Sequence, residues 1–160
     1  MNDAYRARLR SAAAAAALIR DADTLFLPLA PAQPAGLMRA LGARERFSEL
    51  GVLCALLQER FPVLERPGVR VVSQFFSHVE RELRRDGAPI EHLSSDFHGL
   101  ELLARRLRPR VVATTVSPPD EDGYLSFGLH AGACEIPFRE AARDPERLAI
   151  AEVNRRMPAT

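Results

Sequence analysis

The chain has 160 residues and a formal net charge of +1, with 47% hydrophobic and 27% charged residues. This length is typical of one domain that buries roughly two-thirds of the surface exposed by its unfolded chain. The near-neutral charge predicts no general attraction to nucleic acid or to an anionic membrane surface. All 22 basic residues are arginine, which excludes a Schiff-base lysine and a P-loop lysine from this chain.

The amino-terminal segment and the cysteines favour a cytoplasmic protein. The alanine run after Ser11 is weakly hydrophobic and too short to span a bilayer, and Asp3 precedes it. Cys54 and Cys134 lie in apolar or small-residue surroundings, as buried free thiols of a reducing compartment do. We therefore expect no secretory signal, no transmembrane helix and a cytoplasmic location.

Helical and strand-like patterns alternate along most of the chain. Apolar residues at a spacing of three or four indicate helices, and these are expected at residues 5–21, 34–41, 76–85, 97–107 and 137–142. Short apolar or β-branched runs indicate strands, and these are expected at residues 24–29, 69–73, 88–94, 110–116, 124–128 and 147–153. Within the segment 44–68, the apolar run 51–57 fits a strand or a buried helix equally well.

This alternation favours right-handed βαβ units. The predicted fold class is α/β, an open, mainly parallel, doubly wound sheet flanked by helices, in a single domain over residues 1–160. In such sheets ligands bind beyond the carboxyl ends of the strands. The rule selects the loops at residues 30–34, 73–77, 93–96, 117–124 and 154–158, which carry Ser, Gln, Asn and Asp.

Several common signatures of catalysis and cofactor binding are missing. There is no G-x-G-x-x-G after the first strand, no Walker loop, no G-x-S-x-G elbow and no C-x-x-C. His92 and His98 do not have a metal-ligand spacing, so no metal is expected. Residues 94–96 are interpreted as a cap of the following helix. Glu80 and Arg84 are interpreted as an ion pair on a solvated helix face.

The segment 116–128, VSPPDEDGYLSFG, has two interpretations. Pro118 and Pro119 stop the preceding strand and Gly123 permits a positive φ, so the segment can be a turn with acids at its tip. Alternatively, the three consecutive acids at 120–122 are metal ligands or an acid/base cluster. Composition favours the turn but leaves both interpretations open.

Two stretches resemble the acetyl-CoA hydrolase/transferase family, which includes acetate, butyrate and 4-hydroxybutyrate CoA-transferases. The family carries a V-S-P-P-D-x-x-G-Y-x-S-x-G segment and, further along, an A-E-V-N-x-x-M-P-x-T segment. The matching positions here are Val116, Ser117, Pro118, Pro119, Asp120, Gly123, Tyr124, Ser126 and Gly128, then Ala151, Glu152, Val153, Asn154, Met157, Pro158 and Thr160. The similarity spans essentially the whole chain.

The resemblance implies that this chain is the amino-terminal α/β domain of a two-domain protein, with the catalytic second domain absent. The family's nucleophile is a glutamate of that second domain, so no catalytic residue is assigned here. The implied substrates are an acyl-CoA and a small carboxylate, which react through a glutamyl-CoA thioester. The coenzyme A thioester is then a substrate, and no permanently bound cofactor or metal is implied. The full-length form is expected to be a homo-oligomer.

The resemblance also suggests which residues line the cleft between the two domains. The candidates for contact with substrate or CoA are Gln33, Ser117, Pro118, Pro119, Gly123, Tyr124, Ser126, Asn154, Met157 and Pro158. The cleft-facing side is expected to be apolar for a surface.

Two departures from the family pattern favour an alternative hypothesis. The family's glycine-containing loop after the first strand is replaced by the segment 28–36, where no glycine precedes Gly36 and Gln33 is the substitute donor. Asp122 stands where the family often has histidine. The alternative is a stand-alone, non-catalytic domain that binds an acyl-CoA or a partner protein. The sequence does not separate transferase from hydrolase.

Overall fold

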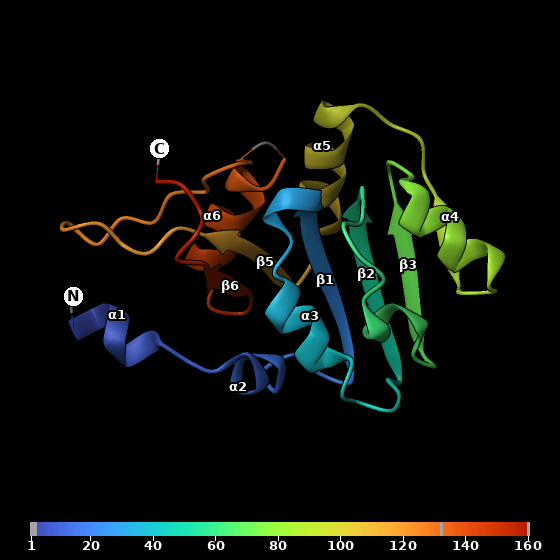
Figure 1. The fold of residues 1–160 in the computed structure, drawn as a ribbon, viewed down its shortest axis with the longest axis horizontal. Helices are drawn as coiled ribbons and strands as arrows, with labels where there is room; N and C mark the ends of the chain where they lie inside the picture. Colours follow the sequence, from blue (N-terminus) through green and yellow to red (C-terminus); the bar gives the residue numbers. More distant parts are fainter. Residues whose placement is uncertain (1–2, 132, 160) are drawn as a thin grey trace.

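The computed structural model describes residues 3–131 and 133–159. One six-stranded sheet, with the order β4-β3-β2-β1-β5-β6, runs through the molecule (Figure 1). The strands are β1 (Ala22–Leu29), β2 (Glu49–Ala55), β3 (Val69–Ser73), β4 (Ile90–His92), β5 (Val111–Val116) and β6 (Leu148–Val153). The helices are α1 (Asp3–Arg8), α2 (Ala12–Ala16), α3 (Ala35–Leu41), α4 (His78–Arg85), α5 (Phe97–Leu107) and α6 (Glu135–Arg143), with the 3₁₀ turns η1 (Ala30–Ala32) and η2 (Pro62–Glu65). Every strand pairing is parallel, which confirms the predicted fold class.

Helices cover both faces of the sheet. Leu37 of α3 packs with Leu25 of β1 in one hydrophobic cluster, to which α2, α4 and η2 also contribute. Leu100 of α5 and Ala141 of α6 pack with Phe26 of β1 in a second cluster. Leu25 and Phe26 are neighbours in sequence but face opposite layers, because successive side chains of a strand alternate between its two faces.

Strand β1 contains Pro28, which has no N–H to donate to the sheet. Its pairing with β2 is regular as far as Phe26 and resumes at Leu29 after a shift in register. The side chain of Gln33 supplies donors at this irregularity: its Nε2 atom lies 3.0 Å from the carbonyl oxygen of Pro28 and 3.1 Å from that of Ala55. The carboxyl ends of the two central strands are therefore joined by one side-chain amide.

Two predicted elements are wrong. The helix expected at 5–21 is instead two short helices, because the Ser11 hydroxyl accepts a hydrogen bond from the Ala14 N–H and begins α2. A serine that bonds the backbone in this way favours a helix start over a helix interior. The strand expected at 124–128 is irregular, and its backbone groups bond within their own loop.

The prediction that Glu80 lies on a solvated face of α4 is wrong. Its side chain is fully buried and accepts hydrogen bonds from the N–H groups of Leu57 and Ser77 and from the Ser73 hydroxyl. Among the ion pairs of the described residues there is none between Glu80 and Arg84. Ser77 and Glu80 form a capping box, and their S-x-x-E spacing was a signal in the sequence.

Other local predictions are confirmed. The run that fitted strand or helix is strand β2, and Asp96 caps α5 by accepting a hydrogen bond from Gly99 N–H at 2.7 Å. Cys54 and Cys134 are buried free thiols, and burial raises the pKa of Cys134 to about 12. The apolar stripe expected along α5 is buried in its middle, whereas Phe97 at its start is 58% exposed.

Residues 3–131 and 133–159 contain neither a candidate membrane span nor a candidate metal site. None of the helices there is both long enough and apolar enough to cross a bilayer. The same part of the chain holds no group of His, Cys, Asp and Glu side chains arranged to bind a metal.

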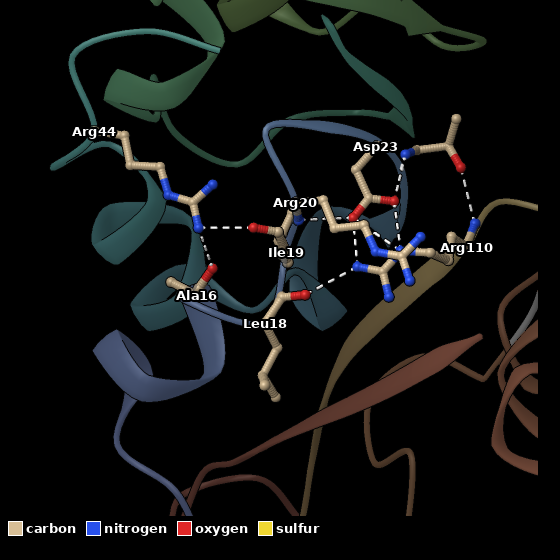
Figure 2. A network of polar contacts seen from close by, with 8 residues as sticks. Ala16, Leu18, Ile19, Arg20, Asp23, Arg44 and Arg110 are labelled. Carbon is tan, nitrogen blue, oxygen red and sulfur yellow. Dashed lines mark hydrogen bonds and ion pairs between the residues drawn. The ribbon is translucent and has the colours of Figure 1, made fainter. Parts of the chain in front are cut away.

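A buried ion pair closes the amino-terminal edge of the sheet (Figure 2). Arg110 donates through Nε to Asp23 Oδ1 at 2.8 Å and through Nη2 to the Leu18 carbonyl at 2.9 Å. The Asp23 side chain is 2% exposed and also accepts a hydrogen bond from the Arg20 N–H. Burial alone would raise the pKa of Asp23, but the hydrogen bonds from Arg110 and the backbone outweigh it and hold this pKa below its usual value. Arg44 binds carbonyl groups around the end of α2 in the same way.

Replacing Asp23 with Asn is expected to lower the free energy of unfolding by about 3 kcal/mol near neutral pH, because Arg110 loses its counter-charge. The folded-state pKa of Asp23 is lowered, so its contribution is complete above the unfolded-state pKa of about 3.9. That contribution disappears as the pH falls through the folded-state value. Urea titrations at decreasing pH should show the two proteins converging in stability.

Glu59→Gln is the matched control, because its ion pair with Arg39 is exposed. This substitution should cost less than about 1 kcal/mol at neutral pH. Equal losses for the two variants would contradict a special role for the buried pair.

Candidate functional site

All five predicted loops follow the carboxyl ends of strands, and the parallel sheet places them at one edge. Strand β1 lies between β2 and β5, so the connections diverge on its two sides. Such a topological switch point is where open α/β sheets bind ligands. The loop that follows β1 meets the end of β5 there, since Thr115 Oγ1 donates to the Gln33 carbonyl at 3.0 Å. We call this edge the carboxyl rim.

Gln33 is 2% exposed and fully engaged with the backbone. Beyond its two bonds at the ends of β1 and β2, its Oε1 accepts a hydrogen bond from the Gln58 N–H at 3.1 Å. Both hydrogens of its amide are occupied by carbonyl groups. Donation from Gln33 to a substrate, as expected from the sequence, would require the side chain to leave these carbonyls.

The segment 116–128, which we call the projecting loop, extends away from the sheet and is drawn in orange in Figure 1. Ser117 N–H donates to the Ser126 carbonyl at 2.9 Å, and Ser117 Oγ accepts from the Ser126 N–H at 3.0 Å. Further out, Asp120 N–H donates to the Tyr124 carbonyl, while Asp120 Oδ1 accepts from the Tyr124 N–H at 2.7 Å. Gly123 has a φ of 89°, which glycine adopts without strain. The turn interpretation is confirmed, and Asp120 is one of the residues that hold the turn.

The two family motifs pack against each other. The Asn154 N–H donates to the Val116 carbonyl at 2.9 Å, so the chain leaving β6 stays beside the end of β5. Met157 is 7% exposed and lies against Gly128. A Cβ atom at Gly128 would be only 2.4 Å from Met157 Cγ, and Gly128 has a φ of 61°. Thr160, the last matching position of the second motif, lies outside the described residues.

Glu152 of β6 is a structural residue of the rim that sequence reasoning matched to the motif but did not single out. Its carboxylate accepts hydrogen bonds from the N–H groups of Gly36 at 3.0 Å and Leu37 at 2.8 Å, in the first turn of α3. Negative charge is favourable beside the unpaired N–H groups that begin a helix. A Cβ at Gly36 would lie 3.1 Å from this carboxylate, so the glycine permits the approach.

The structure separates the sequence candidates by exposure. Gln33, Ser117 and Met157 are buried, Pro119 and Ser126 are half-buried, and Pro118, Gly123, Tyr124, Asn154 and Pro158 are exposed. The buried candidates hold the loops in place. Only the exposed and half-buried ones present side chains or backbone to a ligand in this arrangement.

Large apolar side chains are also exposed around the carboxyl rim. They come from the start of α5, from the projecting loop and its continuation, and from the start of α6: Leu93, Phe97, Tyr124, Leu125, Leu129 and Ile136. Tyr124 is 74% exposed and Leu129 65%. Exposed apolar side chains of this size are candidates for burial against a partner surface.

Gln74 is a rim residue that the sequence placed in a candidate loop but did not name. It follows β3, is 2% exposed and donates its N–H to the Cys54 carbonyl. Its Oε1 is buried and has no hydrogen-bond partner among the described residues. Buried acceptors are normally satisfied, so this oxygen is unusual. The feature of the sequence that could have identified Gln74 is a glutamine directly after a strand.

Gly128→Ala is expected to destabilise the chain by about 2–4 kcal/mol, since a positive φ costs roughly 1 kcal/mol and overpacking against Met157 adds about 1–3. Gly87→Ala is the matched control: its φ is 88°, but nothing lies within 4 Å of the added Cβ. Urea unfolding should show the larger loss for Gly128→Ala, with part of the excess removed by Met157→Ala in the same chain. Equal losses at the two glycines would contradict the packing of the two motifs.

No family model matches the chain. The succinyl-CoA:cyclohexane-1-carboxylate CoA transferase of Geobacter metallireducens is 31% identical over 160 residues, covering 98% of this chain and 35% of that protein. The crystal structure of RipA from Yersinia pestis has a TM-score of 0.76 at 28% identity, covering 96% of this chain and 38% of that one. A 4-hydroxybutyrate CoA-transferase from Porphyromonas gingivalis has a TM-score of 0.61 at 22% identity, a likeness of fold alone.

The sequence match to a CoA transferase extends over nearly the whole of this chain. The same fold recurs in the two solved structures, and the chain spans only about a third of the length of the proteins it matches. The resemblance inferred from the two motifs is confirmed. Over its described length the chain is similar in sequence to a CoA transferase and in fold to these solved structures.

Proposed function

We propose that the chain is the amino-terminal domain of a CoA-transferase or acyl-CoA hydrolase that acts on small acyl-CoA thioesters. The carboxyl rim forms one wall of its active-site cleft. The observation that carries the proposal is the contact between the two family motifs at the carboxyl rim, where Met157 packs on Gly128. The similarity to a CoA transferase over 98% of the chain supports it.

The proposed reaction uses a glutamate carboxylate of a second domain as the nucleophile. The carboxylate attacks the thioester carbonyl and expels CoA thiolate, leaving an acyl-glutamyl anhydride. The thiolate attacks the glutamyl carbonyl of the anhydride, releasing the acyl carboxylate and forming a glutamyl-CoA thioester. An acceptor carboxylate, or water in a hydrolase, resolves this thioester. The reaction needs no permanently bound cofactor.

This chain contributes shape and hydrogen-bond donors to that reaction. Asn154 is exposed, and its Oδ1 accepts a hydrogen bond from the Arg156 N–H at 2.9 Å, which leaves its Nδ2 hydrogens available for an acyl or CoA oxygen. Tyr124 at the outer end of the projecting loop covers the bound thioester. By limiting the access of water, this wall favours transfer over hydrolysis.

The partner of the carboxyl rim is the second domain. Phe97, Leu129 and Ile136 are exposed at the rim, and their burial against that domain would remove apolar surface from water. The full-length protein is proposed to be a homo-oligomer with an acyl-CoA and a small carboxylate as substrates.

A second candidate function is a non-catalytic domain that binds an acyl-CoA or a partner protein. The observation that favours it is the engagement of Gln33, whose amide bonds three carbonyl groups in a loop without the family's glycine. In that case the cleft binds the thioester but nothing activates its carbonyl.

The test compares CoA transfer from acetyl-CoA to small carboxylates by this chain alone and by the chain joined to its second domain. The two-domain protein should turn over and the isolated chain should not, because the nucleophile lies on the second domain. Asn154→Ala should lower kcat/KM by roughly tenfold to a hundredfold, the loss of one or two hydrogen bonds to the substrate. Arg85→Ala, on the exposed end of α4, is the control and should leave kcat/KM unchanged.

Calorimetry with acetyl-CoA separates the two functions. Binding by the two-domain protein without turnover would favour the non-catalytic domain. Turnover by the isolated chain, or an unchanged kcat/KM in Asn154→Ala, would contradict the proposed division of roles.

A further inference from the structure

Arginines gather at the edge of the sheet opposite the carboxyl rim. Two adjoining depressions of about 810 Å³ each open there, between the end of α2, the end of α5 and the turn that follows α6. Their lining includes Arg20, Arg105, Arg106, Arg108, Arg110, Arg143 and Arg147, with the acids Glu140, Asp144 and Glu146. The lining therefore carries a clear excess of positive charge, although the whole chain has a net charge of only +1.

The parallel sheet brings these arginines together. Arg110 and Arg147 directly precede β5 and β6, whose amino-terminal ends are adjacent, because Val111 pairs with Leu148. Arg108 ends α5 in the left-handed conformation, with a φ of 45°. Segments far apart in the sequence thus place guanidinium groups around one depression.

Several of these arginines already have partners. Arg110 is bound to Asp23, Arg108 to Asp144 at 2.9 Å and Arg105 to Glu140 at 3.0 Å. No ion pair of the described residues involves Arg20, which lines the first depression and is exposed.

Arg147 is the arginine of this group whose guanidinium has a buried nitrogen without a hydrogen-bond partner among the described residues. Its Nε donates to the Pro109 carbonyl at 3.0 Å, but its Nη2 is buried and has no hydrogen-bond partner in residues 3–131 and 133–159. Burial lowers the pKa of Arg147, and the neighbouring charge of Arg108 acts in the same direction, against the opposing effect of Asp144. A partly buried charge without a full set of partners is costly, and an anion in the depression would reduce that cost.

We propose that this depression binds a small molecule that carries a phosphoryl group, and that Arg147 and Arg20 hold this group. Guanidinium groups suit phosphate because their planar forks donate two hydrogen bonds to two of its oxygens. The volume lies within the range of small-molecule sites. Leu18, Pro145 and Leu148 line the same depression and give the remainder of the ligand an apolar surface.

The site is independent of the proposed function. It lies at the amino-terminal edge of the sheet, whereas the thioester reaction is proposed at the carboxyl rim. A ligand here would not take part in the acyl transfer. Phosphate chemistry could come from inorganic pyrophosphate or from a nucleoside diphosphate, and the test uses one probe for each.

Isothermal titration calorimetry of the chain with pyrophosphate and with ADP tests the site. Arg147→Gln should weaken the tighter ligand by about tenfold or more, because one charge-assisted hydrogen-bonding group is lost. Arg20→Gln should weaken binding by a similar factor. Among the described residues the side chain of Arg20 forms no hydrogen bond, so this substitution should leave the fold intact. Tighter binding of ADP identifies a nucleotide site, and tighter binding of pyrophosphate an inorganic phosphate site.

Arg85→Gln is the matched control, since Arg85 ends α4 beside the opposite strands of the sheet. It should leave both affinities within about twofold of the parent chain, an allowance for a small change in screened long-range charge. Equal weakening by Arg20→Gln and Arg85→Gln would show general attraction to positive charge and overturn the proposal. Absence of binding by the parent chain at millimolar ligand would overturn it as well.

Discussion

The side-chain amide of Gln33 is the contact on which the carboxyl rim depends. Pro28 interrupts the hydrogen bonding of a central strand, and the Gln33 Nε2 group bonds the carbonyls left at the ends of β1 and β2. With its side chain held there, the Gln33 carbonyl accepts from Thr115 of β5, and the chain continues into α3. The first turn of α3 then meets Glu152 of β6. One loop therefore links the ends of β1, β2, β5 and β6, which are the strands around the switch point.

Most of the architecture could be predicted from local patterns, because each buried strand is a short apolar run and each covering helix has an apolar stripe. The predictions failed where a contact outside the pattern decides the structure. Residues 124–128 read as a strand, but the backbone groups of Tyr124 and Ser126 bond to Asp120 and Ser117 within the loop and not to the sheet. The long amino-terminal helix failed at Ser11, where a side-chain hydrogen bond starts a second helix.

The candidate site was located by the loop rule and by the resemblance to the family, but the roles of its residues were not visible in the sequence. Motif residues look alike in a sequence whether they are buried supports, as Ser117 and Met157 are, or exposed groups such as Asn154. Glu152 was not singled out, and Glu80 was wrongly assigned to a solvated ion pair, because a carboxylate that bonds distant backbone N–H groups has no local signature beyond a capping pattern. The arginines that line the depression around Arg147 could not be predicted either, since the pairing of β5 with β6 brings them together.

The central claim is that the carboxyl rim is one wall of a cleft completed by a second domain. Hydrogen–deuterium exchange of the chain alone and of the chain joined to that domain, each with and without acetyl-CoA, tests it most directly. The claim predicts slower exchange at residues 117–129 and 154–158 in the joined protein and a further slowing with acetyl-CoA, with residues 108–111 at the opposite edge unchanged. Unchanged exchange at the rim, or protection confined to the opposite edge, would contradict it.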